Sequence, residues 1–389
     1  KAVEAGLKPV LFEKRLLGGV CLNEGCIPSK TLLNCAKRYS HAQSSASYGV
    51  SAKDVTFDMK AAMARKEKVI GTLRRGTESS KKKLKIPVVF EETTILEPSG
   101  GTFSVKAGKE TFQGQRLLIC TGSEAIRLPI PGADQPFVYT NREILSVDSV
   151  PGKLVIIGGG VIGLEFASLF AELGSAVTVL EMLPTIAGPL DDDVRKVLQS
   201  EFKKKGVAIH TEAKVTSIGD HTVAYDTAGG KSETAEGDIV LMSVGRRPVV
   251  EGFGLEKLGV AVERGAIRVD AQGRTSVPGV WAAGDVNGKS MLAHTASREV
   301  EVCIDDMVGK QSHIRYENIP NVIYTHPEVA CVGLTGAAAR ERGFDVVEHR
   351  LPMTFNGRYL AETEGERGTC KVVVEKEHGT VLGVHMVGG

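Results

Sequence analysis

The sequence predicts an α/β protein, and three observations support this prediction. A strand, a glycine-rich turn, a helix and a second strand follow one another over residues 153–182. The second half of the same pattern recurs at the start of the chain. Glycine is abundant, with 45 residues in 389, and 42% of the residues are hydrophobic, which is typical of α/β proteins with many tight turns. A chain of this length can form cores for two or three domains.

The segment 153–182, KLVIIGGGVIGLEFASLFAELGSAVTVLEM, is the most regular part of the chain. Gly158 permits a tight turn after the first strand, Gly160 lets backbone approach a pyrophosphate, and Gly163 lets the helix pack close to the strand. The N-terminus of that helix then faces the phosphates. Glu181 ends the second strand, where a carboxylate can accept hydrogen bonds from both ribose hydroxyls and repels a 2′-phosphate. The segment therefore predicts a Rossmann-like unit that binds NAD rather than NADP.

The first residues repeat the end of this unit. KAVEAGLKPVLFEK carries Gly6 seven positions before Glu13, as Gly174 stands seven positions before Glu181. In the complete copy the last glycine of the turn lies 11 residues before Gly174, and the same spacing projected back from Gly6 falls before residue 1. We therefore expect a second dinucleotide-binding unit whose first strand and glycine turn precede this chain, so that the chain begins inside a helix.

Two further apolar strands end in residues suited to a nucleotide. RTSVPGVWAAGDV, residues 274–286, places Asp285 at the end of a buried strand, where it can reach a ribityl hydroxyl of a flavin. LLICTGS, residues 117–123, ends in Thr-Gly-Ser, which suits close backbone approach. Together with the repeat, these patterns predict two cofactors, FAD and NAD.

Two cysteines stand close together in GGVCLNEGCIPSK, and three interpretations are open: a zinc half-site, a structural crosslink or an exchangeable pair. Zinc is disfavoured because no second Cys or His pair has suitable spacing, and no metal is predicted. Residues five apart in a regular helix are too distant for a disulfide, so the turn between Cys21 and Cys26 must be distorted, and Gly25 allows this. Such a short bridge stabilises the fold only modestly. Pro28 suits a first helical turn, whose partial positive charge favours thiolates. The pattern favours an exchangeable dithiol beside a flavin.

Composition narrows the possible partners and compartments. The formal net charge of +1 gives no reason to expect nucleic acid or anionic membrane, and the basic run 81–85 is interpreted as a solvated helix end. No apolar stretch reaches the length of a membrane span, and no secretory signal opens the chain. The other cysteines are scattered, which favours a reducing, cytoplasmic setting and a filler role for them. These are Cys35, Cys120, Cys303, Cys331 and Cys370.

Several motifs together resemble one enzyme family, the pyridine nucleotide-disulfide oxidoreductases. The matching segments run nearly from end to end: GGVCLNEGCIPSKTLL, CTGS, IIGGGVIGLEFA, SVGRRP, VWAAGDV, MLAHTASREV, YTHPEVACVGLT and VLGVHMVGG. The chain is most similar to those members that oxidise dihydrolipoamide. The relatives that reduce glutathione generally have Pro-Lys-Lys after the second cysteine, Ala at the last turn glycine and basic residues for NADP.

The resemblance implies a redox-active disulfide, formed by Cys21 and Cys26, that acts with FAD and NAD. Cys21 would be the interchange thiol that meets dihydrolipoamide, and Cys26 the thiol against the flavin. Lys30 would lie near the flavin and pair with Glu165. The implied partners are a dihydrolipoyl group on a lipoyl domain of a 2-oxoacid dehydrogenase or glycine cleavage complex, and a second copy of the chain in a homodimer. The alternatives are a related disulfide or mercuric reductase, or an inactive truncated piece that only binds.

The remaining site residues are carried over by matching position. Those implied for FAD are Glu13, Gly19, Lys30, Thr121, Gly122, Ser123, Asp285, Met291, Leu292, Ala293 and His294. Those implied for NAD are Gly158, Gly160, Val161, Ile162, Gly163, Glu181, Val215 and Gly245.

The family's catalytic base, a histidine in a His-Pro motif near the C-terminus, is expected to lie beyond this chain. His326, followed by Pro327 and Glu328, resembles that motif but falls in the segment that opens the interface domain, so we interpret it as structural. His385 ends a strand-like run and is also an unsuitable base. We therefore expect the literal fragment to hold flavin weakly and to turn over negligibly.

The predicted architecture has two Rossmann-like, three-layer dinucleotide-binding domains and part of an α+β interface domain. The FAD-binding domain spans 1–126 and lacks its first strand and glycine loop. The NAD-binding domain spans 127–248, a central domain completing the FAD site spans 249–318, and the C-terminally incomplete interface (dimerisation) domain spans 319–389.

Overall fold

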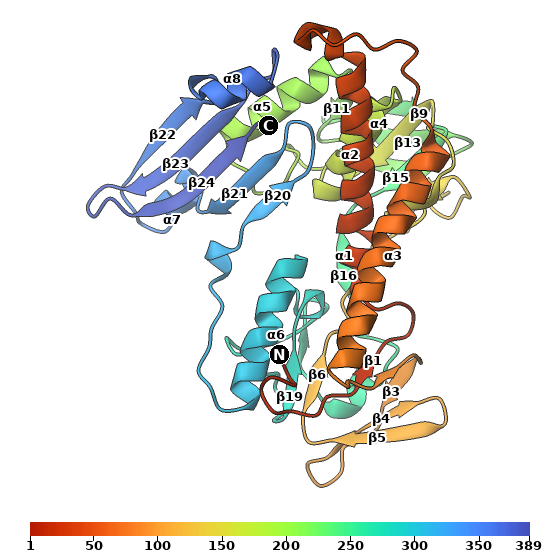
Figure 1. Ribbon diagram of the computed structural model, residues 1–389, viewed down its shortest axis with the longest axis vertical. Coiled ribbons are helices and arrows are strands. Elements are labelled where there is room, and N and C mark those ends of the chain that lie inside the picture. The colour runs from red at the N-terminus through yellow and green to blue at the C-terminus, as the bar shows by residue number, and fades with distance from the viewer. The chain divides into compact units, whose positions relative to one another are not determined.

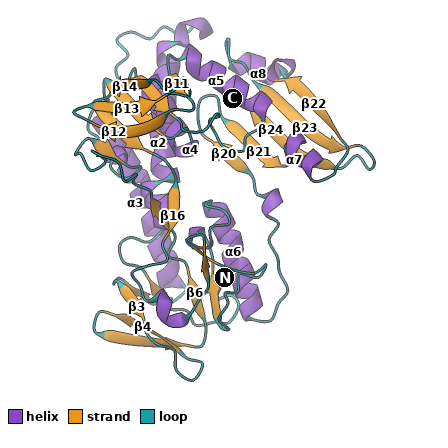
Figure 2. Ribbon diagram, turned by 180° about the vertical axis from the view of Figure 1, so that it is seen from behind, coloured by secondary structure: helices purple, strands orange, loops and turns teal.

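A computed structural model describes residues 1–389, which divide into two compact units (Figures 1 and 2). Each unit is assembled from three separate stretches of the chain. The first unit contains residues 1–23, 70–125 and 246–316, and the second contains 24–69, 126–245 and 317–389.

A five-stranded, all-parallel sheet forms the centre of the second unit. Its order is β11 (Ala208–His210), β10 (Ala176–Leu180), β9 (Lys153–Ile157), β15 (Ile239–Met242) and β8 (Val138–Tyr139). The chain winds outward from β9 through β10 to β11 and then returns to pair β15 with the other side of β9. The strand order therefore reverses between β9 and β15, and ligands of such sheets bind at the carboxyl ends of the strands at this switch point.

Alternate residues of β9 serve the two faces of this sheet, which makes three layers. Leu154 and Ile156 pack with α2 (Cys26–Gln43), α4 (Val161–Glu172) and α5 (Asp192–Lys204) in one core. Val155 and Ile157 pack on the other face against a three-stranded antiparallel sheet (Figure 2). That sheet contains β12 (Lys214–Ile218), β13 (Thr222–Asp226) and β14 (Ser232–Glu236). Burial on both sides explains the unbroken apolar run of β9.

The C-terminal stretch of the second unit adds a five-stranded antiparallel sheet, against which α5 lies (Figure 1). Its order is β20 (Asn321–Ile323), β21 (Val329–Gly333), β24 (Val381–Val387), β23 (Thr369–Glu375) and β22 (Val346–Pro352). The short helices α7 (Gly336–Glu341) and α8 (Gly357–Glu362) connect its strands, with a 3₁₀ turn at η6 (Met353–Phe355). This stretch is the predicted α+β domain.

The first unit is built from short strands in several small sheets. Its parallel strands form two pairs, β1 (Leu11–Phe12) with β2 (Val88–Val89) and β6 (Leu117–Ile119) with β19 (Val280–Ala282). The antiparallel groups are β3 (Thr93–Ile95), β4 (Phe103–Ala107) and β5 (Glu110–Gly114); β7 (Ser123–Ala125) with β16 (Arg246–Pro248); and β17 (Val262–Glu263) with β18 (Ala266–Ile267).

The helices outside these sheets complete the list of elements. They are α1 (Gly19–Glu24), α3 (Met59–Lys83), α6 (Ala293–Met307) and the 3₁₀ helices η1 (Ser45–Tyr48), η2 (Ile144–Ser146), η3 (Leu255–Leu258), η4 (Asp285–Asn287) and η5 (Tyr316–Asn318). None of the helices is both long enough and apolar enough to cross a bilayer.

The start of the chain differs from the expected helix. Ala5 N donates to Lys1 O at 2.8 Å and Leu7 N donates to Ala2 O at 2.9 Å, which closes a turn but makes no helix. Gly6 ends the turn with a φ of +81°, the left-handed conformation that often follows a helix. The prediction that the chain begins inside a helix is therefore wrong as stated, because these residues make only one hydrogen-bonded turn.

Candidate active site

The two cysteines lie on either side of a break between two helices. Cys21 belongs to α1 and Cys26 is the first residue of α2, while Gly25 between them has non-helical angles of φ −146° and ψ −109°. Cys21 and Cys26 are disulfide-bonded, and the other five cysteines are free. The distortion that the spacing required is therefore present at Gly25.

The position of Cys26 suits a thiolate. It starts a helix of 18 residues, and Gly25 offers no side-chain cap to the first backbone N–H groups. The partial positive charge at such a helix N-terminus favours an anion such as a thiolate. Pro28 stands in the same first turn, where its missing N–H costs no hydrogen bond. Of the two sulfurs, Cys26 is thus the one that the fold equips to carry negative charge.

Lys30 and Glu165 meet at a third residue, Tyr324. Lys30 follows Cys26 by one turn of α2, and its Nζ lies 4.0 Å from the centroid of the Tyr324 ring. Glu165, on α4, accepts a hydrogen bond from Tyr324 N at 3.0 Å. Burial raises the pKa of Glu165, although the hydrogen bond from Tyr324 and the charge of Lys30 oppose that rise. The structure therefore groups an ammonium, a phenol ring and a partly buried carboxyl one helical turn from Cys26.

The three glycines of the turn after β9 differ in what a side chain would meet. A Cβ at Gly158, whose φ is +105°, would lie 2.5 Å from Ser243 O, at the end of β15. A Cβ at Gly163 would lie 2.2 Å from Gly158 O and 3.1 Å from Ile156 Cγ2, so the close approach of helix to strand is real. A Cβ at Gly160 would meet nothing within 4 Å. This open space precedes the N-terminus of α4, which carries no side-chain cap, and it fits a pyrophosphate.

The Glu181 carboxylate is held by two backbone N–H groups, one in the glycine turn and one in the loop after β10. Oε2 accepts from Gly159 N at 2.6 Å, and Oε1 accepts from Leu183 N at 2.7 Å. The backbone also ties the end of β10 to the segment just before β12, since Ala213 N donates to Glu181 O at 2.9 Å. A fixed carboxylate at this place fits the ribose of NAD and opposes a 2′-phosphate.

The remaining residues implied for NAD lie in two places. Val161 and Ile162 begin α4, and Gly245 follows β15 with a φ of +117°. Val215 is half-buried on β12 and packs against the core under the sheet, so its place fits a core residue as well as a lining residue.

Among the residues implied for FAD, a hydrogen-bonded group joins three segments of the first unit. Ser123 Oγ donates to Asp285 Oδ2 at 2.5 Å, and Arg246 Nε donates to Ser123 Oγ at 2.8 Å. Thr121 Oγ1 donates to Val249 O at 2.7 Å. Between them Gly122 has a φ of +73° and no atom within 4 Å of a Cβ, so it leaves room for a cofactor beside the chain.

The other residues implied for FAD lie at element ends. Glu13 directly follows β1 and accepts from Arg15 N at 2.8 Å, and Gly19 starts α1. The stretch from Met291 to His294 leads into α6, with Ala293 as its first residue and Leu292 as its cap.

Three residues of this environment were not predicted from the sequence alone. Tyr324 and Arg246 lie within motifs that carried the resemblance, YTHPEVACVGLT and SVGRRP, but neither motif indicated these contacts. Glu299 is 4% exposed on α6, and it accepts from Gly284 N at 2.6 Å and from the Tyr316 hydroxyl at 2.6 Å. Glu299 thereby holds the turn that presents Asp285.

The two histidines that were judged unsuitable as bases have structural contacts. His326 N donates to Ser168 Oγ at 3.0 Å, and its Nδ1 lies 2.8 Å from Glu172 Oε1. His385 is 2% exposed, with Nε2 at 3.0 Å from Leu334 O. Both side chains are held by neighbours far from the cysteines in sequence.

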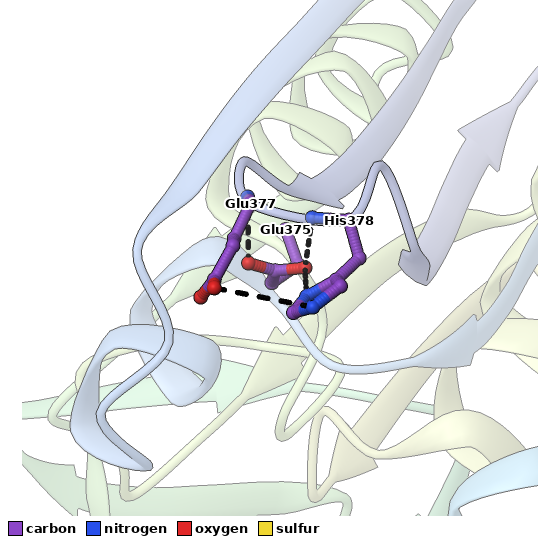
Figure 3. A group of neighbouring side chains, drawn as sticks. All are labelled: Glu375, Glu377 and His378. Atoms are coloured by element: carbon purple, nitrogen blue, oxygen red, sulfur yellow. Dashed lines mark hydrogen bonds and ion pairs between the residues drawn. The ribbon is translucent and has the colours of Figure 1, made fainter.

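A group of side chains near the turn between β23 and β24 could be mistaken for an ion site (Figure 3). Glu375 accepts backbone hydrogen bonds from Glu377 N at 2.7 Å and His378 N at 2.9 Å. Its Oε2 also lies 3.2 Å from His378 Nδ1. These contacts close the turn, and Glu377 and His378 are exposed. The group therefore has a structural explanation.

Comparison with known proteins identifies the class to which this fold and disulfide belong. Residues 1–299 match the family model described as pyridine nucleotide-disulphide oxidoreductase, and residues 319–389 match the dimerisation domain of the same family. The chain therefore belongs to the pyridine nucleotide-disulphide oxidoreductase family.

Particular relatives share most of the chain. It is 37% identical to the mitochondrial dihydrolipoyl dehydrogenase of Pisum sativum, over 100% of this chain and 79% of that protein. It is 36% identical to the dihydrolipoyl dehydrogenase of Geobacillus stearothermophilus, over 100% of this chain and 83% of that protein. The solved structure of the HOCl-induced flavoprotein disulfide reductase RclA from Escherichia coli matches with a TM-score of 0.86 and 28% identity, over 99% of this chain and 85% of that one.

These matches confirm the predicted α/β oxidoreductase, with FAD and NAD as the cofactors of its family. They also confirm that a dimerisation domain is present. The division at residues 126, 248 and 318 stays a prediction, as do the roles of individual site residues.

Proposed function

We propose that the intact enzyme to which this chain belongs oxidises dihydrolipoamide to lipoamide and passes the electrons to NAD⁺, as a dihydrolipoyl dehydrogenase. The observation that carries the proposal is the Cys21–Cys26 disulfide, which spans the non-helical residue Gly25 and places Cys26 at the N-terminus of an 18-residue helix. The similarity to two dihydrolipoyl dehydrogenases along the whole chain supports the choice of substrate within the family.

The chemistry proposed for the cysteines is thiol–disulfide exchange. A thiolate of dihydrolipoamide attacks Cys21 Sγ, the Cys21–Cys26 bond breaks, and Cys26 leaves as a thiolate. The second thiol of the substrate, as a thiolate, then attacks its own sulfur in the mixed disulfide, which releases oxidised lipoamide and leaves Cys21 reduced. Two electrons have then moved from the substrate to the cysteine pair. The N-terminus of α2 stabilises Cys26 as the leaving thiolate.

Bound FAD and NAD⁺ supply the two-electron chemistry that returns the pair to the disulfide. The residues proposed to hold FAD are Glu13, Gly19, Thr121, Gly122, Ser123, Asp285 and Met291 to His294. Those proposed to hold NAD are the glycines of the turn with Val161 and Ile162, together with Glu181, Val215 and Gly245.

Lys30 and Glu165 are proposed to set the charge around the reduced pair. Lys30 stands one turn after Cys26 on α2, so its ammonium adds to the positive field of the helix N-terminus. Glu165 accepts a hydrogen bond from the backbone N–H of Tyr324, and Lys30 contacts the ring of the same tyrosine. Glu165 thereby keeps the ammonium in place through Tyr324. Because burial raises the pKa of Glu165, this carboxyl also retains a proton to higher pH than an exposed glutamate.

The proposed partner is a lipoyl domain of a 2-oxoacid dehydrogenase or glycine cleavage complex, and the proposed assembly is a homodimer. The dimerisation domain at 319–389 supports the assembly. Five free cysteines support a reducing compartment such as the cytoplasm.

Steady-state assays with single-cysteine variants test the proposal. The intact, FAD-loaded enzyme should reduce NAD⁺ with dihydrolipoamide and should not reduce glutathione disulfide or mercuric ion. Cys21→Ser and Cys26→Ser should each lower kcat with dihydrolipoamide by about 10³-fold or more, because each removes a covalent step. Cys370→Ser, which changes a free cysteine on β23, is the matched control and should keep wild-type rates. Turnover that survives in Cys26→Ser, or a preference for glutathione disulfide, contradicts the proposal.

A further inference from the structure

The loop between β10 and α5, residues 182–190, forms one wall of the glycine turn. Ala187 N donates to Gly159 O at 2.8 Å, while Gly159 N donates to Glu181 Oε2 at 2.6 Å. Ile186 is fully buried, and its Cγ2 would be only 2.8 Å from a Cβ placed on Gly159. Gly159 is thus held at its N–H by Glu181 and at its C=O by the loop, so a displaced loop displaces the turn.

One side chain, Arg195, binds three backbone carbonyls of this loop. Its Nε donates to Ile186 O at 3.0 Å, and its Nη2 donates to Gly188 O at 2.9 Å and Leu190 O at 2.5 Å. Its Nη1 also pairs with the carboxylate of Asp192. A guanidinium offers five donors in a rigid fork, which suits it to bind three carbonyls along a loop at once.

Arg195 occupies a place that is unfavourable for a cation. It lies in the first turn of α5, where the helix dipole repels positive charge, and only 9% of the residue is exposed. Burial of a charge is costly unless hydrogen bonds replace its water. Proteins place a residue against such local preferences mainly at functional or strained sites. Here the bonds to the loop and the ion pair with Asp192 compensate for the burial.

The helix end that carries Arg195 is itself anchored. Asp191 caps α5 and is 4% exposed, and its carboxylate lies 3.0 Å from Lys371 Nζ on β23. Asp193 lies 3.0 Å from the same Nζ. Because a buried ion pair fixes this turn, Arg195 donates its hydrogen bonds to the loop from a fixed position.

We infer that Arg195 is a positioning residue for the dinucleotide. It holds residues 182–190 against Gly159 so that the glycine turn and the Glu181 carboxylate keep the geometry that receives the adenosine half of NAD. The inference rests on the proposed function for the identity of the ligand. It assigns no contact between Arg195 and the cofactor, so its effect falls on dinucleotide affinity and leaves the dithiol chemistry unchanged.

The test compares Arg195→Met, Arg195→Lys and the control Lys196→Met in the FAD-loaded enzyme. Lys196 is exposed and adjacent on α5, which makes it a matched control. Arg195→Met should raise the Kd for NADH and the KM for NAD⁺ by about tenfold or more, because several charge-assisted hydrogen bonds are lost. The kcat at saturating NAD⁺ and the KM for dihydrolipoamide should stay at wild-type values. Hydrogen exchange of the Ala187 amide should accelerate. Arg195→Lys should recover part of the affinity, and Lys196→Met should match wild type.

The inference is overturned if Arg195→Met keeps the wild-type Kd for NADH and wild-type exchange in residues 182–190. A fall in kcat and thermal stability with an unchanged KM for NAD⁺ also overturns it, since that pattern marks a purely structural role. If Arg195→Met fails to fold, the Kd and the exchange of Arg195→Lys decide, and wild-type values in both overturn the inference. The measurements of NADH binding and of hydrogen exchange need no dihydrolipoamide. If the wild-type enzyme does not turn over dihydrolipoamide, the proposed function is wrong, but this test of Arg195 can still be made.

Discussion

Replacing Gly158 by alanine should destabilise the dinucleotide-binding domain before any ligand is added. The φ of +105° at Gly158 places an L side chain in a region that costs about 1–2 kcal/mol for a residue other than glycine. The added Cβ would also lie 2.5 Å from Ser243 O and 2.8 Å from Ser243 C, which are backbone atoms next to β15. They cannot withdraw without disturbing the pairing of β15 with β9. We expect a total loss of about 2–4 kcal/mol, in the range of strain combined with overpacking.

The neighbouring Gly160 provides the matched comparison. It has ordinary angles, φ −78° and ψ −178°, and a Cβ there would meet nothing within 4 Å. Gly160→Ala should therefore change stability by less than about 0.5 kcal/mol. It should nevertheless weaken NADH binding by about tenfold or more, because the methyl group occupies the space through which backbone approaches the pyrophosphate.

Thermal unfolding and NADH titration of both variants distinguish the two effects. Gly158→Ala should lower the melting temperature of the domain by about 5–10 °C, given the usual relation of stability to Tm for domains of this size. Gly160→Ala should have the melting temperature of wild type and differ from it only in NADH affinity. The reasoning is refuted if Gly158→Ala melts with wild type, or if Gly160→Ala loses stability to the same extent.

Three further predictions follow from buried charge and exposed apolar surface. Burial alone would raise the pKa of Glu172, but hydrogen bonds from His326 and Lys205 outweigh it and lower the pKa below its ordinary 4.5. The stabilisation by the ionised carboxylate is therefore full above pH 4.5 and is lost as the pH falls through the lowered pKa. In urea unfolding, Glu172→Gln should lower the free energy of unfolding by about 1–3 kcal/mol at pH 7 and by less at pH 3. Stabilities of wild type and variant that change in parallel with pH would contradict this. Lys371→Met leaves three carboxylates without their shared cation and should cost about 3–5 kcal/mol, whereas stability equal to wild type at pH 7 would show that the pairs are not needed. Phe355 is 78% exposed in the dimerisation domain, so Phe355→Ser should raise the dimer dissociation constant in sedimentation equilibrium, and an unchanged constant would place the interface elsewhere.

The sequence predicted those parts of the site that depend on short spacings. The distortion between Cys21 and Cys26 followed from helix geometry, and the structure has it at Gly25. The strand, turn and helix around Gly163 followed from the glycine pattern, and their close packing is present. Local spacing is informative here because backbone geometry over a few residues leaves few conformations.

Contacts between distant segments could not be predicted in the same way. The pairing of Lys30 with Glu165 stays a prediction, whereas the contact that each of them makes with Tyr324, from a segment far along the chain, was not foreseen. The buried Glu299 behind Asp285 was also not foreseen. No periodicity in a sequence states which side chains of two remote elements will face each other.

The order of strand, glycines, helix and acid was enough to determine the family's nucleotide chemistry, because each residue type answers a steric or charge requirement within its own βαβ unit. Tertiary structure alone decided which side chains hold that unit in shape. Arg195 reads in sequence as an ordinary residue of an exposed, charged helix, yet the fold buries it and turns its donors onto three loop carbonyls. The physical reason is that burial and hydrogen-bond partners arise from packing between elements, which residue order along one element does not specify.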